Sequence, residues 1–365
     1  MQPAGTKGRL LPVRALDTMP VMKIAILCTL GPASLKPDVI RQLDERGVDL
    51  FRINLSHTPL EAVQSTIELV QRVSSTPISL DSEGPQVRCG LVQDGVILEE
   101  GRGIRLRADA VPGTQSELTL WPETIFAQLQ VGTLVGVDFA GALLRITAAQ
   151  EDGADAVVVS SGKIASNKAV TVDPQPVLPA LSDKDRAALE IGSRMGISHY
   201  CLSFATGQAD VAQMRSLVPA GATIIAKIES RAGVRNMDQI IGAADAVLID
   251  RGDLSHEIAL EYVPFYQKAI VRHANRWNRR VYVATNLLES MVTSNVPTIA
   301  EANDIANTLL DGVHGLVLAA ETAIGLDPVG SVDIVLRIIR AFEETNDRLL
   351  LFEDRAPATA DLLAD

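Results

Sequence analysis

The sequence predicts an α/β fold: a closed (β/α)8 barrel of the TIM type, with a small all-β domain inserted after the third strand. Three observations support this prediction. Eight short, β-rich apolar segments each precede an amphipathic stretch, as in repeated strand–helix units with a parallel sheet. The alternation breaks between about Cys89 and Asp173. The chain has 365 residues, 47% of them hydrophobic, which is enough for a large core.

Each predicted strand is a short apolar run, and the runs begin at Lys23, Leu50, Ile78, His199, Thr223, Ala246, Arg280 and Gly315. Eight parallel strands with following helices most simply close into a barrel, and an open doubly wound sheet is the weaker alternative because its edges would need protection. Capping boxes predict helix starts at Thr58–Glu61 and Thr298–Glu301. The last helix carries an apolar stripe from Val332 to Phe342.

The interrupting stretch contains short strand-like runs separated by Gly and Asp, within residues 95–101, 103–109, 131–139, 142–148 and 155–161. The Pro-rich passage Asp173–Pro179 predicts a stiff hinge back into the barrel. The expected organisation is therefore an N-terminal tail (1–20), a barrel (21–88 and 174–348), an inserted lid domain (89–173) and a C-terminal tail (349–365).

Composition excludes several classes of protein. The formal net charge of −12 argues against a general nucleic-acid binder. Three scattered cysteines are too few for a disulfide framework or a zinc cluster. No apolar run is long enough to predict a membrane span, and the N-terminus does not resemble a signal peptide. We therefore expect a cytoplasmic protein that binds neither nucleic acid nor membrane.

Polar residues interrupt the predicted strands at their carboxyl ends, where barrels of this kind carry their chemistry. Glu229 and Asp253 follow adjacent strands and suit an oxygen-ligated divalent ion such as Mg²⁺ or Mn²⁺. Lys227 could stabilise a developing enolate or a transferring phosphoryl group, and Arg52 could hold a phosphate or carboxylate. A further oxygen-rich cluster comprises Asn54, Ser56, Asp81 and Ser82. Spacing alone leaves two interpretations of that cluster open, a monovalent-cation site or an ordinary network of caps and turns.

These residues lie in motifs that resemble the pyruvate kinase family over about Met22 to Glu344. The motifs, in chain order, are CTLGPAS (Cys28–Ser34), FRINLSH (Phe51–His57), LDSEGPQVRCG (Leu80–Gly90), IIAKIESRAGVRN (Ile224–Asn236), RGDLSHEI (Arg251–Ile258), VATNLLESM (Val283–Met291), PTIAEANDIAN (Pro297–Asn307) and AAETAIG (Ala319–Gly325). The resemblance implies phosphoryl transfer from phosphoenolpyruvate to ADP, giving pyruvate and ATP. The inserted domain would then act as a lid over the site.

The resemblance also implies residue roles at the matching positions. It implies catalytic roles for Lys227, Arg52 and Thr285, and it places Gly252 and Asp253 with these three in the substrate site. Glu229 and Asp253 match the divalent-metal ligands, and Asn54, Ser56, Asp81 and Ser82 match a potassium site. The positions that match the nucleotide pocket are Pro32, Asn54, His57, Arg88 and Lys168.

The chain departs from the family pattern at several positions. Glu83 replaces a lysine beside the expected phosphate site, Ala319 replaces a serine, and Thr206 and Ile299 each replace an arginine. The remaining departures are Gln86, which replaces a glutamate, and Asp250, Ser255 and His256 around Asp253. The resemblance does not extend to the family's usual C-terminal domain, so we expect no allosteric site of that domain. A homodimer through barrel helices is compatible with this organisation.

Three hypotheses follow. The first is a pyruvate kinase-like phosphotransferase, which the surviving motif residues favour. The second is a divergent metal–enolate enzyme, a lyase, an aldolase or an altered phosphotransferase, acting on another 2-oxo acid, which the departures at Glu83, Ala319, Thr206 and Ile299 suggest. The third is a non-catalytic protein on an inherited barrel, and the intact Lys227, Glu229 and Asp253 argue against it.

Overall fold

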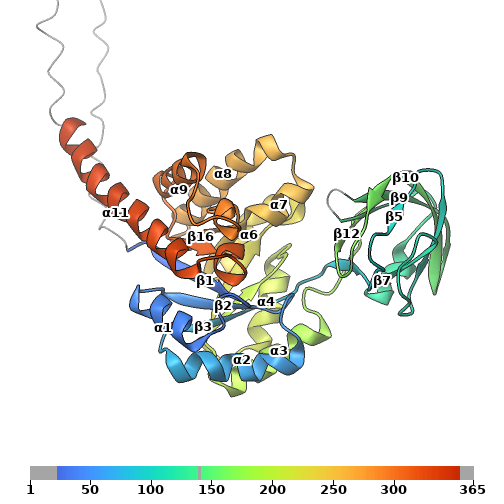
Figure 1. Cartoon of the computed structure of the whole chain (residues 1–365), viewed down its shortest axis with the longest axis horizontal. Helices are drawn as coiled ribbons and strands as arrows, with labels where there is room; N and C mark the ends of the chain where they lie inside the picture. Colours follow the sequence, from blue (N-terminus) through green and yellow to red (C-terminus); the bar gives the residue numbers. More distant parts are fainter. Residues whose placement is uncertain (1–22, 139–140, 354–365) are drawn as a thin grey trace, which may run out of the picture.

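Two closed barrels form the molecule (Figure 1). The computed structural model describes residues 23–138 and 141–353, so the tail predicted for residues 1–20 lies outside the described residues. The larger barrel is entirely parallel and has the strand order β1, β17, β16, β15, β14, β13, β3, β2. Its strands are β1 (Ala25–Leu30), β2 (Leu50–Asn54), β3 (Ile78–Asp81), β13 (His199–Leu202), β14 (Thr223–Ile228), β15 (Ala246–Asp250), β16 (Arg280–Ala284) and β17 (Gly315–Leu318). The predicted fold class and all eight predicted strands are confirmed.

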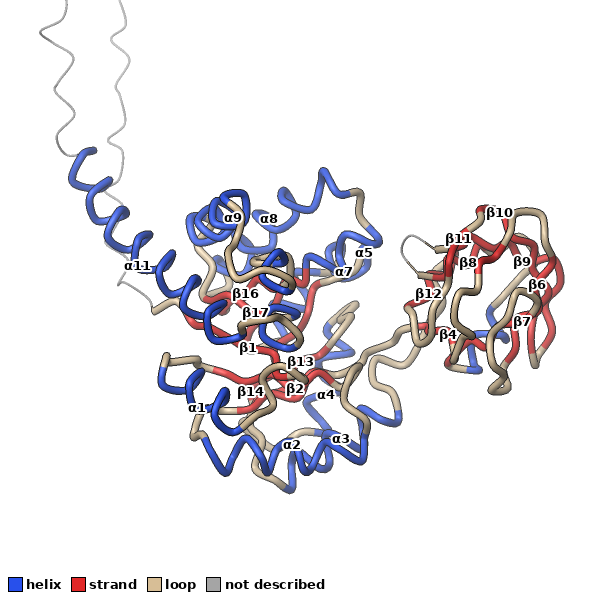
Figure 2. The backbone as a smooth tube through the Cα atoms, viewed as in Figure 1, coloured by secondary structure: helices blue, strands red, loops and turns tan. Residues whose placement is uncertain are grey.

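Helices surround this barrel, whereas the smaller barrel is built almost wholly of strands (Figure 2). The helices are α1 (Pro37–Glu45), α2 (Leu60–Val73), α3 (Asp183–Arg194), α4 (Gln208–Leu217), α5 (Arg231–Arg235), α6 (Met237–Ala243), α7 (Arg251–Glu257), α8 (Val263–Arg276), α9 (Ile299–Leu310), α10 (Ala320–Ala323) and α11 (Pro328–Glu353), with short 3₁₀ turns at Leu260–Tyr262 and Glu289–Val292. None of the helices in the described part of the chain has the length and apolarity to cross a bilayer.

The strands of the large barrel alternate between two separate cores. On β1, Ile26 packs in the large core beneath the helices, and Leu27 packs in a small core with Ile225 and Leu248. Successive side chains of a strand point to opposite faces, so residues two apart share a face. The small core therefore fills the inside of the barrel, and residues in step with it at the strand ends face the barrel mouth.

The helix-start predictions had mixed outcomes. The Thr298 hydroxyl caps α9 by accepting from the Glu301 amide, and the Glu301 carboxylate accepts from the Thr298 amide, which confirms that capping box. The Thr58 prediction was wrong: α2 begins at Leu60, and Pro59 occupies the capping position without a side-chain hydrogen bond. The helix starts one residue later than the motif requires, so the Thr58 side chain is out of place to cap it.

The C-terminal tail was predicted to begin at residue 349, but α11 continues to Glu353. The added residues include no glycine or proline, and several of them are good helix formers, so the backbone has no local reason to stop.

The smaller barrel occupies the expected insertion between β3 and α3. Its closed sheet has the order β10 (Gly153–Ser160), β6 (Gly103–Arg107), β7 (Glu117–Trp121), β4 (Val87–Cys89), β12 (Ala169–Asp173), β8 (Leu134–Val137), β9 (Ala142–Gln150), and a separate ribbon pairs β11 (Gly162–Lys163) with β5 (Ile97–Leu98). The strands β7, β11 and β12 were not predicted from the sequence. The predicted boundary at residue 89 falls within β4, because a three-residue strand carries too little periodicity to detect.

Candidate active site

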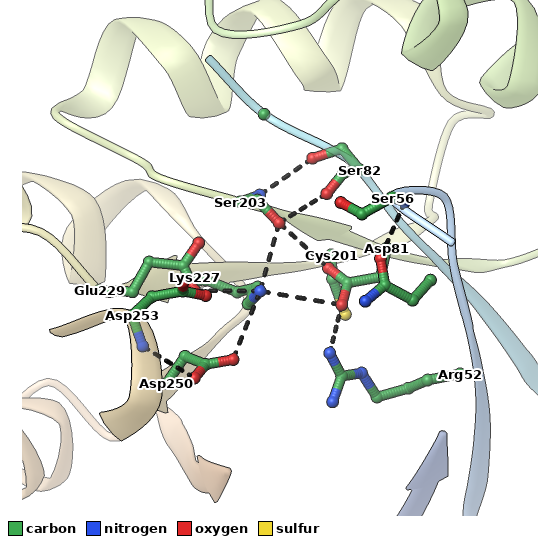
Figure 3. Close-up of polar contacts among 12 residues, drawn as sticks. Arg52, Ser56, Asp81, Ser82, Cys201, Ser203, Lys227, Glu229, Asp250 and Asp253 are labelled. Carbon is green, nitrogen blue, oxygen red and sulfur yellow. Dashed lines mark hydrogen bonds and ion pairs between the residues drawn. The ribbon is translucent and has the colours of Figure 1, made fainter. Parts of the chain in front are cut away.

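Polar side chains gather at the carboxyl ends of the large barrel's strands (Figure 3). Lys227 lies on β14 in step with the inward-facing Ile225, and Glu229 follows two residues later. Arg52 on β2 and Asp81 on β3 take the same inward direction from neighbouring strands. Because the strands are parallel, their alternation places these groups together at one mouth of the barrel.

Lys227 is the centre of this group. Its Nζ atom lies 2.9 Å from Glu229 Oε2, 3.6 Å from Asp250 Oδ2 and 3.8 Å from Asp81 Oδ2. It also donates a 3.3 Å hydrogen bond to the Ser203 hydroxyl. The Lys227 side chain is buried, so its ammonium is surrounded by carboxylates instead of water. It must stay charged, because a neutral amine would leave those buried negative charges without a partner.

The electrostatics show an excess of negative charge. Burial lowers the pKa of Lys227, but the carboxylates of Asp81, Glu229 and Asp250 outweigh it and raise that pKa well above its ordinary value. Burial also raises the pKa of Glu229 well above its ordinary value, and it raises the pKa of Asp253, together with Asp250, to about 6. The crowding of carboxylates contributes to all three raised pKa values, because neighbouring negative charges attract a proton or a cation.

Arg52 forms a buried ion pair with Asp81 through Nη2. Burial lowers the pKa of Arg52 and Asp81 raises it, with a net upward direction. The Arg52 Nε atom is buried without a hydrogen-bond partner, so one donor of the guanidinium is unused. A buried donor without an acceptor is costly, and an anionic substrate at this mouth would supply one.

Three carboxylates can hold a divalent cation. Glu229, Asp250 and Asp253 each offer an oxygen within 4.8 Å of the others. Glu229 is fully buried; its Oε1 accepts a 2.7 Å hydrogen bond from the Phe204 amide, while Oε2 faces the Lys227 ammonium at 2.9 Å. Clustered carboxylate oxygens are the ligands that Mg²⁺ and Mn²⁺ prefer, so this donor set fits such an ion.

The oxygen-rich cluster expected for a monovalent cation comes from β2, β3 and the turns after them. The strand register places Asn54 opposite Asp81, and Ser56 and Ser82 lie beside Asp81 in Figure 3. Asn54 Oδ1 accepts from the Ser56 amide at 2.9 Å, and Ser82 Oγ accepts from the Ser203 amide at 2.9 Å. The cluster therefore contains the ordinary hydrogen bonds of caps and turns, and its oxygens also keep lone pairs that could bind a monovalent cation.

Thr285 and Gly252 meet where β16 and β15 end. The Thr285 hydroxyl oxygen accepts a 2.7 Å hydrogen bond from the Gly252 amide and lies 3.1 Å from Asp250 Oδ1. Thr285 has a φ of 67°, a left-handed conformation that is rare for a β-branched residue. Such strain is kept where surrounding contacts fix it, and here it aims the hydroxyl at the start of α7.

The residues expected around a nucleotide come from the loop after β1, from the end of β2 and the turn after it, and from the small barrel. Arg88 donates to Gln86 Oε1 at 2.6 Å and to Asn167 O at 3.0 Å. Burial, then Arg88 and Lys184, lower the pKa of His57, which is therefore neutral near pH 7. Pro32 is exposed in the loop after β1. Lys168 on the small barrel pairs with Asp138 of the same barrel at 3.5 Å.

The departures from the family pattern have local partners. Glu83 pairs with Lys184 at 2.8 Å, which offsets the negative charge that the substitution introduces. Thr206 binds Asp210 through its amide and its hydroxyl, and the Ala319 amide donates to Glu321. Ile299 is 91% exposed at the start of α9, and nothing in the structure explains it.

Sequence reasoning missed Asp250 and Ser203 as members of the site. Asp250 was identified only as a departure in the loop around Asp253. It is the last residue of β15 and lies on the inward face of that strand, in step with Ala246 and Leu248. Ser203 follows the inward-facing Cys201 in the same way and contacts both Asp81 and Lys227. Alternation along each strand was the signal that could have found them.

Comparisons with known proteins agree with this geometry. The family model described as "Pyruvate kinase, barrel domain" matches residues 21–332. The pyruvate kinase of Methylorubrum extorquens is 37% identical over 326 residues, which cover 87% of this chain and 68% of that protein. The Geobacillus stearothermophilus pyruvate kinase is 33% identical over 356 residues, covering 94% and 61%. The crystal structure of Cryptosporidium parvum pyruvate kinase matches with a TM-score of 0.82 at 29% identity, covering 88% and 71%.

Proposed function

We propose the chemistry of this site from one premise: the chain belongs to the pyruvate kinase family, by the match over residues 21–332 and by relatives that are 32–37% identical. It is an enzyme with a pyruvate kinase-like phosphotransferase function. Its substrates are then phosphoenolpyruvate and ADP, and its products are pyruvate and ATP. The comparisons do not favour the alternative of a metal–enolate enzyme acting on another 2-oxo acid.

In the proposed reaction the phosphoryl group leaves the enol oxygen of phosphoenolpyruvate for a terminal oxygen of ADP. The Lys227 ammonium neutralises the negative charge that spreads over the transferring group and the enolate oxygen, and the unused Arg52 donor orients the phosphate. The Thr285 hydroxyl and the Gly252 amide position the substrate beside α7. Protonation of the enolate at C3 then completes pyruvate.

Glu229 and Asp253 would hold Mg²⁺ or Mn²⁺, which when bound supplies positive charge to the substrate oxygens. Asn54, Ser56, Asp81 and Ser82 would hold K⁺. Pro32, Asn54, His57, Arg88 and Lys168 would line the nucleotide site, with Lys168 carried on the small barrel as a lid. The homodimer and the cytoplasmic location expected from the sequence remain predictions.

One observation carries this proposal: Lys227 and the carboxylates of Glu229, Asp250 and Asp253 converge at a single barrel mouth. The test measures pyruvate formation from phosphoenolpyruvate and ADP with Mg²⁺, in K⁺ and in tetramethylammonium. Turnover that requires the divalent ion and rises with K⁺ supports the assignment. Folded protein that exchanges C3 protons of pyruvate without any kinase turnover would replace it with the metal–enolate alternative.

A further inference from the structure

Asp250 is a buried carboxylate at the barrel mouth, at a position where this chain departs from the family motif. It is the last residue of β15 and lies in step with the inward-facing Leu248. Its side chain points toward Lys227 in Figure 3. Lys227 lies on the neighbouring strand β14, and Glu229 directly follows that strand. The residue is only 6% exposed, so an unbalanced charge there would be costly.

The Asp250 carboxylate is held from two sides. Oδ2 lies 3.6 Å from Lys227 Nζ, while Oδ1 lies 3.1 Å from the Thr285 hydroxyl and 3.5 Å from the Asp253 amide. These contacts fix the carboxylate between the lysine and the start of α7. The group is therefore positioned before any ligand arrives, as a metal ligand must be if it is to bind without rearrangement.

The charges around Asp250 favour a divalent cation. Glu229, Asp250 and Asp253 bring three negative charges when ionised, and Lys227 brings one positive charge, which leaves an excess that one divalent ion neutralises. Arg52 and Asp81 form their own buried pair and do not change this balance. A monovalent ion would neutralise only half of the excess.

A second, independent observation points to a ligand. Glu229 Oε2 is fully buried, and its partner among the described residues is the Lys227 ammonium at 2.9 Å, so the oxygen keeps a lone pair for a further partner. A carboxylate oxygen in a protein interior normally accepts hydrogen bonds or binds a metal ion. Glu229, Asp250 and Asp253 each offer one carboxylate oxygen within 4.8 Å of the other two.

We propose that Asp250 is a third protein ligand of the divalent-cation centre, beside Glu229 and Asp253. The inference rests on the proposed function, since it concerns the same centre. A third carboxylate ligand would let the divalent cation bind before phosphoenolpyruvate. Two carboxylates leave much of the coordination shell to the substrate, whereas three bind Mg²⁺ or Mn²⁺ tightly before phosphoenolpyruvate arrives.

The test measures Mn²⁺ binding to the substrate-free protein, from the free-ion signal in electron paramagnetic resonance and by calorimetry. The D250N variant keeps an oxygen for the Thr285 hydroxyl and the Asp253 amide but removes the charge. We expect D250N to weaken Mn²⁺ binding by about tenfold or more. The matched control is D304N, because Asp304 lies on α9, pairs with Arg251 of α7 and is not one of the clustered carboxylates, so its loss leaves binding unchanged.

A measurement on the unaltered protein covers the case in which D250N misfolds. Pulsed resonance of bound Mn²⁺ counts its water ligands, and three protein carboxylates leave about three waters where two would leave about four in an octahedral shell. A count of four water ligands on bound Mn²⁺ overturns the role of Asp250 and leaves the proposed function standing. The same conclusion follows if folded D250N binds Mn²⁺ with wild-type affinity while E229Q loses Mn²⁺ binding. Absence of Mn²⁺ binding to the wild type removes the centre itself.

Discussion

Replacing Lys227 with methionine removes an ammonium that contacts three carboxylates at the barrel mouth. Methionine is unbranched and of similar length, so K227M fills the same space without the charge. The lost contacts are the ion pairs at 2.9 Å to Glu229, 3.6 Å to Asp250 and 3.8 Å to Asp81. The variant therefore tests charge rather than packing.

The magnitude follows from these distances. At an effective dielectric constant of about 20, each pair is worth roughly 4–6 kcal/mol before desolvation is counted. Because the carboxylates can take up protons or a cation when the ammonium is gone, we expect a net loss of about 3–5 kcal/mol of stability. The loss of charge stabilisation in the transition state lowers kcat by at least about 10²–10³-fold.

The assay measures initial rates of pyruvate formation, with Mn²⁺ binding and thermal unfolding followed on the same samples. Removal of a positive charge beside the carboxylates leaves Mn²⁺ binding intact or tightens it. The control is K268M, because Lys268 is a half-exposed lysine of α8 that pairs with Asp311 away from the site. A folded K227M protein with kcat within about threefold of the wild type would refute the role of Lys227.

Three further predictions concern the rim and the fold. K168M removes the proposed contact to the nucleotide phosphates, so we expect KM for ADP to rise about tenfold with KM for phosphoenolpyruvate unchanged; equal changes in both would contradict it. E83Q leaves its lysine partner unbalanced, so KM for ADP falls about two- to threefold at low salt and the effect vanishes near 0.5 M salt, in rates measured at both ionic strengths. Burial raises the pKa of Glu301, but hydrogen bonds from Ser290 and Thr298 outweigh it and hold that pKa below 4.5. A depressed carboxyl pKa stabilises the folded state fully above about pH 4.5 and less as the pH falls through the folded value. Urea unfolding of E301Q therefore shows a stability deficit at pH 7 that shrinks in acid, and a deficit independent of pH would contradict this.

Much of the fold could be predicted because its signals are local. The β-rich runs from Lys23 to Gly315 and their amphipathic partners repeat often enough to define strands and helices independently of context. The capping box at Thr298 was visible for the same reason, since all its atoms lie within four residues. A feature decided by distant contacts was missed, since β4 became a strand only by pairing with β7 and β12. The Thr58 capping box failed for a local reason, because α2 begins one residue later than the motif requires.

The sequence by itself determined the alternation of strands and helices, the inserted segment, and the identity of the rim residues such as Lys227 and Glu229. Only the tertiary structure decided which charges meet, because ion pairs depend on distances between strands that sequence spacing does not contain. The fold pairs Glu83 with Lys184, which offsets the charge reversal at that position, and it brings the Asp250 carboxylate beside those of Glu229 and Asp253. Barrel closure is the physical reason, since it brings the ends of eight separate strands to one mouth, where electrostatic energies of several kcal/mol depend on a few ångströms.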